Sequence, residues 1–229
     1  MTTPRSAAGD APDWAHHPRR RARLWAEFLI LFAGMPLLLA FGLEARMMWP
    51  LLGGCFVVGL ALLAVTPGFE WRELLHGPLI PRPMHFLGFL QVTLAICFGL
   101  VLWLIPGALF WLPQRRPELW LTIVLLYPFL SALPQEIIFR VLFFRRYGFL
   151  FPSRVVGVSV NAALFGLAHL FLSNWVSLSM TVAGGAIFAW AYLSGPRPNL
   201  LFPVLMHAIA GIIIFTCGLG RFFFHGALQ

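Results

Sequence analysis

Long apolar stretches, separated by short polar segments, fill the chain from residue 24 to residue 218. A helix needs about 20 mainly apolar residues to cross the hydrocarbon core of a membrane, and most of these stretches reach or approach that length. The pattern therefore predicts an all-α, polytopic transmembrane helix bundle of about seven spans. The predicted spans are residues 24–43, 48–66, 86–112, 119–143, 155–172, 175–194 and 200–218.

Prolines interrupt two of these spans. The third span, 86–112, is long and contains Pro106, so we expect it to tilt or to break there. The fourth span, 119–143, contains Pro128 and Pro134, and we expect it to be kinked or made of two pieces. Broken helices at membrane depth are tolerated where they line a cavity.

The remaining segments are polar and short. Residues 1–23 are rich in Pro, Ala and Arg, and we interpret them as a disordered, basic cytoplasmic arm that anchors on anionic lipids. Residues 24–218 form the transmembrane domain, and residues 219–229 form a short C-terminal tail. The loop 67–85 is amphipathic enough to lie on the inner membrane surface.

The arginines predict the orientation of the chain. All 16 basic residues are arginines, and most of them fall on one side of the predicted bundle. The positive-inside rule makes that side cytoplasmic, which places the N-terminus inside and the C-terminus outside. The cytoplasmic set is Arg5, Arg19, Arg20, Arg21, Arg23, Arg72, Arg82, Arg145, Arg146, Arg154 and Arg197, against Arg46, Arg115, Arg116 and Arg221 outside.

Composition agrees with a membrane protein. The chain is 60% hydrophobic and only 10% charged, whereas soluble domains carry about 25% charged residues. The net charge of +8 fits basic cytoplasmic loops, so we expect the lipid bilayer and no nucleic acid as a partner. Cys55, Cys97 and Cys217 stand singly in apolar runs, which argues against a disulfide framework or a structural zinc site. We expect an integral protein of the bacterial inner membrane.

Glu136 is the one acidic residue well inside an apolar stretch. A carboxylate in a membrane span is costly and normally faces the protein interior or a water-filled cavity, where it has a function. Arg140 follows four residues later, so on a helix the two side chains share a face and can pair. Either they form a structural ion pair that fixes two helices, or Glu136 is a general base that the guanidinium keeps ionised.

Two histidines lie in later apolar spans. His169 follows Phe165 by four residues, which on a helix puts both rings on one face, and His207 lies in the last span. A single histidine in an apolar helix is more often a hydrogen-bonded core residue than a catalyst. Two of them, with a buried carboxylate on a third span, are sufficient for a water-activating site within the bilayer.

At these residues the chain resembles the CPBP family of intramembrane proteases, which includes the CAAX prenyl endopeptidases and bacteriocin-processing relatives. The family carries Glu-Glu-x-x-x-Arg, Phe-x-x-x-His and His-x-x-x-Asn on successive transmembrane helices. The resemblance covers residues 119–218 and implies a protease core. The matching residues are Gln135-Glu136-x-x-x-Arg140, Phe165-x-x-x-His169 and His207-x-x-x-Gly211.

Two positions depart from the family pattern. Gln135 stands where the family has the Glu usually assigned as the base, and a Gln cannot take a proton at neutral pH. Glu136 would therefore have to be the base. Gly211 stands where an Asn would help to bind the oxyanion, and losing one such donor costs about 3 kcal/mol of barrier in other enzymes. Asn161, two turns before His169, could supply a donor, although a helix–helix hydrogen bond is its more common role.

The resemblance implies hydrolysis of a peptide bond in a membrane-associated peptide or protein, without a cofactor. Glu136 and His169 would hold and deprotonate a water near the cytoplasmic third of the membrane. His207, with Gln135 or Asn161, would stabilise the oxyanion. Arg140 would fix the Glu136 carboxylate. The candidate catalytic residues are Glu136, His169, His207, Arg140 and Gln135, and the candidates for substrate or oxyanion binding are Asn161 and Phe165.

Three other functions remain open. The Gln135 and Gly211 changes are also typical of a non-catalytic relative that binds a membrane peptide, in immunity or as a chaperone. Glu136 and the two histidines could ligate Zn²⁺ in a metal-dependent hydrolase, although no HExxH spacing supports it. A small transporter could use Glu136 as a proton site, but the chain has no internal repeat.

Overall fold

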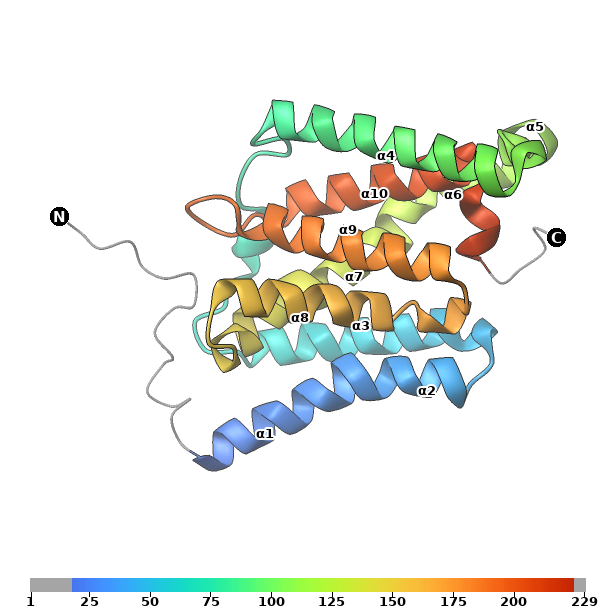
Figure 1. Ribbon diagram of the computed structural model, residues 1–229. Coiled ribbons are helices and arrows are strands. Elements are labelled where there is room, and N and C mark those ends of the chain that lie inside the picture. The colour runs from blue at the N-terminus through green and yellow to red at the C-terminus, as the bar shows by residue number, and fades with distance from the viewer. Residues whose placement is uncertain (1–17, 225–229) are drawn as a thin grey trace.

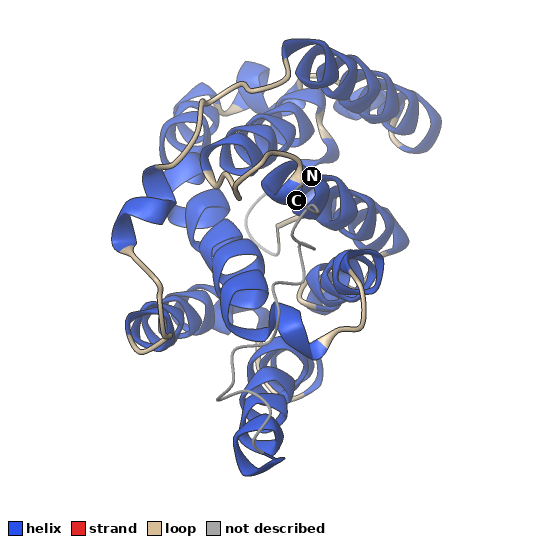
Figure 2. Ribbon diagram, turned by 90° about the vertical axis from the view of Figure 1, so that its left-hand side faces the viewer, coloured by secondary structure: helices blue, strands red, loops and turns tan. Residues whose placement is uncertain are grey.

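The computed structural model describes residues 18–224 as a bundle of helices, with no strand in that range (Figures 1 and 2). Six helical segments are long and apolar enough to cross a membrane, and a shorter apolar helix follows them. The predicted all-α polytopic bundle is confirmed. The six segments are Pro18–Phe41, Ala45–Ala64, Pro83–Leu104, Pro117–Leu150, Arg154–Leu172 and Trp175–Leu193, and the shorter helix is Leu201–Cys217.

Within these segments the α-helices are joined by short 3₁₀ and π-helical turns. Several of the long segments therefore contain more than one labelled helix (Figure 1). The α-helices are α1 (Pro18–Leu29), α2 (Met35–Phe41), α3 (Met48–Ala64), α4 (Pro83–Leu104), α5 (Trp111–Arg115), α6 (Pro117–Tyr127), α7 (Leu133–Glu136), α8 (Arg154–Leu167), α9 (Trp175–Leu193) and α10 (Leu201–Cys217).

The first helix begins earlier than the apolar pattern predicts. α1 starts at Pro18, ahead of the predicted start at residue 24, so the last part of the expected disordered arm is helical. Proline is pre-organised for the first helical position and arginine is a good helix former. Arg23 also pairs with Glu27 one turn later, at 2.9 Å. The rest of the predicted arm and residues 225–229 of the predicted tail lie outside the described residues.

The expected break in the third span is confirmed. α4 ends at Leu104, and Pro106 begins a short 3₁₀ turn, Pro106–Ala108, before α5. Ile105, the residue before the proline, leaves the helical region with φ −151° and ψ 58°. A residue that precedes proline avoids the α conformation because the proline ring collides with its backbone.

The fourth span stays helical through both prolines, contrary to a division into two pieces. α6 passes into a π-helical segment at Pro128–Ala132, then into α7, and then into a second π-helical segment, Ile137–Tyr147. π-helical turns are rare and often occur at functional sites. This span crosses the bundle obliquely behind α9 and α10 (Figure 1).

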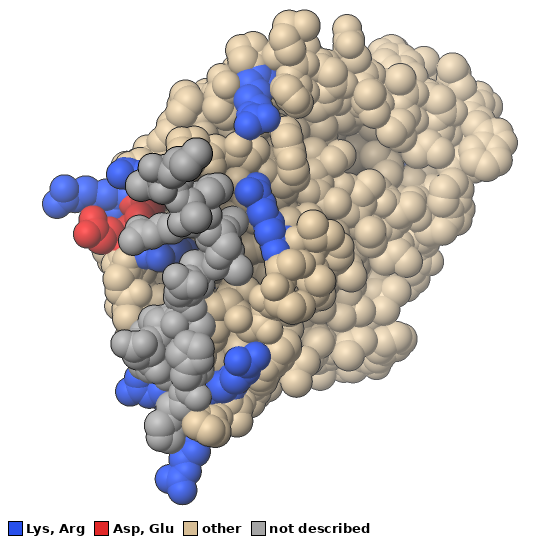
Figure 3. Space-filling model, turned by 60° about the vertical axis from the view of Figure 1, so that its left-hand side comes forward, with Lys and Arg blue, Asp and Glu red and all other residues tan. Residues whose placement is uncertain are grey.

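Figure 3 turns the end of the bundle at which α1 and α4 begin toward the viewer, and arginine side chains are spread over that end. Arg146 pairs with Glu27 of α1 at 2.7 Å, and Arg145 pairs with Glu73 of the loop before α4, also at 2.7 Å. These ion pairs tie the loop and α1 to the end of the π-helical segment. At the same end, Arg82 and Arg154 donate to the carbonyls of Ser194 and Leu193, after and at the end of α9.

Glycine lets α8 and α9 pack closely. A Cβ atom on Gly185 would lie 3.0 Å from the Cα atom of Ala162 and 3.0 Å from the Cβ atom of Phe165.

We therefore expect Gly185→Leu to lower the free energy of unfolding by about 1–3 kcal/mol through overpacking, as measured by denaturant titration in detergent. Gly54→Ala is the control, because the added carbon meets nothing within 4 Å in α3. Equal stability of the Gly185→Leu variant and the wild type would contradict close packing here.

Candidate active site

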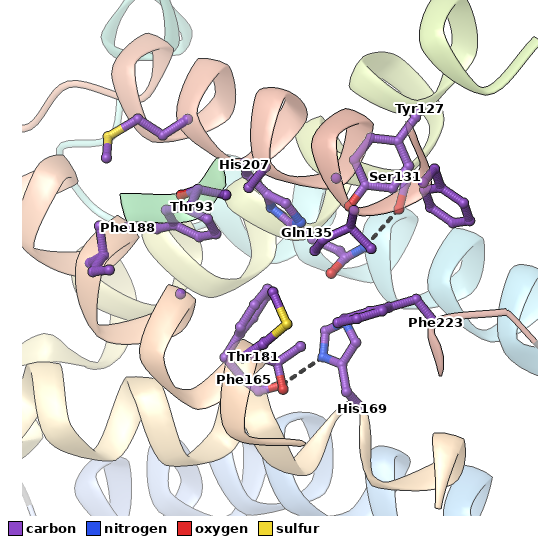
Figure 4. Close-up of a pocket in the computed structure, with 18 of the residues that line it drawn as sticks. Thr93, Tyr127, Ser131, Gln135, Phe165, His169, Thr181, Phe188, His207 and Phe223 are labelled. Atoms are coloured by element: carbon purple, nitrogen blue, oxygen red, sulfur yellow. Dashed lines mark hydrogen bonds between the residues drawn. The ribbon is translucent and has the colours of Figure 1, made fainter. Parts of the chain in front are cut away.

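A cavity of about 880 Å³ lies among α4, α6, α9 and α10, within the size range of ligand sites. Its walls are mainly apolar, and all three motif segments reach it: Gln135 lies on α7, Phe165 and His169 at the end of α8, and His207 on α10 (Figure 4). His85, near the start of α4, and Trp49, near the start of α3, also line the cavity. Its labelled polar side chains are Thr93, Tyr127, Ser131, Gln135, His169, Thr181 and His207.

Glu136 lies behind the cavity wall. Its side chain is fully buried and is absent from the residues that line the cavity. One carboxylate oxygen accepts a hydrogen bond from Arg140 Nε at 2.9 Å, and the other accepts one from His207 Nδ1 at 2.9 Å. The neighbour of Glu136, Gln135, faces the cavity instead. The carboxylate therefore lies behind the residues that border the cavity, with both oxygens hydrogen-bonded to protein side chains.

Arg140 and Asn161 fix this carboxylate from behind. The Arg140 guanidinium donates to the Asn161 side-chain oxygen, and the Asn161 amide donates to the Phe139 carbonyl at 2.6 Å. Arg140 also lies over the Phe165 ring, 4.9 Å from its centroid, a favourable cation–π geometry. Asn161 thus joins α8 to the π-helical segment and does not line the cavity, which matches the helix–helix bond and not the oxyanion role.

His207 is held in one orientation by its neighbours. Its ring stacks on Phe188, with centroids 5.0 Å apart and an interplanar angle of 17°, and meets the edge of Phe165 at 5.6 Å. The Glu136 carboxylate can only accept hydrogen bonds, so Nδ1 of His207 carries a hydrogen. The second ring nitrogen, Nε2, is available to interact with a substrate in the cavity.

His169 lies just beyond the end of a helix and not within it. α8 ends at Leu167, and the His169 amide bonds to Gly166, which leaves the Phe165 carbonyl without its usual helical partner. The His169 imidazole takes that place, with Nδ1 2.8 Å from the Phe165 oxygen. A carbonyl only accepts, so Nδ1 carries the hydrogen, and in the neutral ring Nε2 has a free lone pair.

Gln135 belongs to a row of polar side chains whose other two members, Tyr127 and Ser131, the sequence analysis did not identify. Its amide donates to the Ser131 hydroxyl at 2.9 Å, and Tyr127 precedes Ser131 by one turn on the same wall (Figure 4). The i, i+4, i+8 spacing of Tyr127, Ser131 and Gln135 in an apolar span was the available signal. His169 and Phe165 lie across the cavity from this row (Figure 4).

Metal ligands are not gathered in this site. Among residues 18–224 no group of three His, Cys, Asp or Glu side chains is arranged to hold a metal ion. Glu136, one of the three ligands considered for Zn²⁺, has both oxygens engaged by Arg140 and His207.

Comparison with known families gives one match. The family described as type II CAAX prenyl endopeptidase Rce1-like matches residues 117–213. The matched stretch begins with α6 and ends within α10, so it contains every motif residue, and it is consistent with the CPBP resemblance. No curated protein and no solved structure matches the chain.

Proposed function

Because residues 117–213 match the Rce1-like protease family and lie in a bundle of membrane-spanning helices, we propose that the chain is an intramembrane endopeptidase with histidine-based catalysis. Its substrates are membrane-associated peptides or proteins, and its membrane is the bacterial inner membrane. One observation carries the proposal: two imidazoles from separate spans, His169 and His207, line one cavity, and each is anchored through Nδ1.

His169 is the general base in the proposed reaction. Its Nδ1–H is held by the Phe165 carbonyl, so Nε2 accepts a proton from the attacking water. The water oxygen bonds to the carbonyl carbon of the substrate, and the carbonyl oxygen becomes the oxyanion. When the C–N bond breaks, the proton on Nε2 passes to the leaving amine. This sequence of steps needs no carboxylate at the cavity.

His207 and Gln135 are the proposed oxyanion donors. With both ring nitrogens protonated, His207 donates from Nδ1 to Glu136 and from Nε2 to the developing negative charge. The Gln135 amide has a second hydrogen besides the one that Ser131 accepts. Glu136 becomes a positioning residue that orients His207, and Arg140 holds Glu136 in place. No metal enters these steps.

The test uses the purified protein in lipid nanodiscs with a membrane-anchored model peptide in H₂¹⁸O. We expect cleavage that introduces one ¹⁸O atom into the new carboxylate, as mass spectrometry of the products detects. His207→Ala should lower kcat about 10²–10³-fold, the effect of losing one oxyanion donor.

The matched control is His76→Ala, because His76 is exposed on the loop at the inner end and contacts Arg197 rather than the cavity. It should cleave at the wild-type rate. Full activity of His207→Ala would remove this residue from the mechanism. Activity that chelators abolish and Zn²⁺ restores would favour the metal-dependent alternative.

A specific observation also favours a second function, peptide binding without cleavage. Among the described residues, the cavity wall carries the amide Gln135 and no carboxylate, although the family pattern has Glu at that position. Such a protein would bind the model peptide and release no product. Appearance of cleavage only in a Gln135→Glu variant would favour this second function over the first.

A further inference from the structure

At one position of the cavity wall, the Tyr127 ring occupies the space that a side chain on Gly211 would need. A Cβ atom on Gly211 would lie 2.2 Å and 2.4 Å from two ring carbons of Tyr127 and 2.7 Å from its hydroxyl oxygen. Real Cβ atoms essentially never approach another atom within 3.0 Å. Position 211 must therefore be glycine while Tyr127 keeps its place, and the phenol occupies the space that a side chain from α10 would use.

The phenol lies beside the proposed oxyanion donors. The Tyr127 ring meets the His207 ring edge to face, with centroids 6.0 Å apart and an interplanar angle of 75°. Ser131, which accepts the Gln135 hydrogen bond, is one turn further along the same helical segment and lines the same cavity. Tyr127, Gln135 and His207 all border the same cavity (Figure 4).

From this geometry we infer that the Tyr127 hydroxyl is a further oxyanion donor of the site, and that Gly211 serves to admit it. The inference rests on the proposed endopeptidase function. A phenol carries one O–H donor, and a donor fixed in a mainly apolar cavity acts more strongly than in water. Gly211 stands where the family pattern has an Asn donor. Its missing side chain leaves the space that a different donor, Tyr127 from α6, occupies.

The decisive variant is Tyr127→Phe, which keeps the ring and its packing and removes only the hydroxyl. With the same model peptide, we expect kcat to fall about 10²-fold with KM nearly unchanged, because the hydroxyl acts mainly in the transition state. Tyr192→Phe is the matched control: Tyr192 is buried against Phe144, away from the cavity lining, and its variant should keep the wild-type kcat.

A donor exchange separates chemistry from packing. Gly211→Asn alone should lose activity and melt at a lower temperature, because its Cβ atom collides with the Tyr127 ring. In a Tyr127→Ala background the asparagine has room and brings an amide donor, so the double variant should be more active than Tyr127→Ala.

The outcomes distinguish a failure of the endopeptidase function from a failure of the donor role of Tyr127. A wild-type protein that cleaves no substrate would contradict the endopeptidase function itself. An active wild type with a Tyr127→Phe variant of equal kcat would overturn the donor role and leave the function standing. A Tyr127→Phe variant that changes KM alone would also overturn it, because ground-state packing would then explain the residue.

Discussion

Replacing Glu136 with alanine is expected to lower the free energy of unfolding by about 3–5 kcal/mol and to abolish cleavage. The substitution leaves Arg140 fully buried without its carboxylate partner, and an uncompensated buried charge is strongly destabilising. It also removes the acceptor that orients His207. Denaturant titration in detergent micelles measures the stability, and the nanodisc assay measures the cleavage.

Removing both members of the ion pair tests this explanation. A Glu136→Leu/Arg140→Met double variant has no unpaired charge, and replacement of a buried pair by apolar residues is often nearly neutral. We expect it to recover most of the lost stability and to stay inactive. Glu44→Ala is the control, since Glu44 pairs with Arg46 on the exposed surface, where ion pairs contribute little. A double variant as unstable as Glu136→Ala would refute the unpaired-charge account.

His169→Ala is expected to lower kcat about 10²–10⁴-fold, the usual contribution of a general base, with little change in stability. His169 lies past the end of α8, and its imidazole is held by a hydrogen bond to the Phe165 carbonyl. The alanine leaves a gap at the cavity wall that free imidazole can enter, so added imidazole should restore part of the activity. His207→Ala, whose imidazole is not the base, should not be rescued in the same way. Undiminished kcat in His169→Ala would remove it from the mechanism.

The sequence predicted the membrane bundle well, because span length and apolar content are properties of local sequence. The break at Pro106 followed from proline stereochemistry, and the pairing of Glu136 with Arg140 followed from their i, i+4 spacing. The start of α1 at Pro18 was missed, since a polar, arginine-rich turn gives no apolar signal.

Which side chain of the fourth span faces the cavity could not be predicted. The span contains two π-helical segments, and each changes the angular step between residues, so adjacent positions such as Gln135 and Glu136 cannot be assigned a face from α-helical periodicity. The partner of Asn161 and the contact of Tyr127 with Gly211 depend on helices far apart in the sequence. Hydrophobic patterning carries no information on either contact.

The two anchored imidazoles have a consequence for where a substrate is cut. Nδ1 of His169 is held by a backbone carbonyl and Nδ1 of His207 by a buried carboxylate, so both rings keep a constant height within the bundle. Under the proposed function, a polypeptide lying along the apolar cavity meets them at that height only. The depth of a peptide bond in the membrane then determines whether it is cleaved. The distance of that bond from the lipid headgroups matters more than the residues on either side of it.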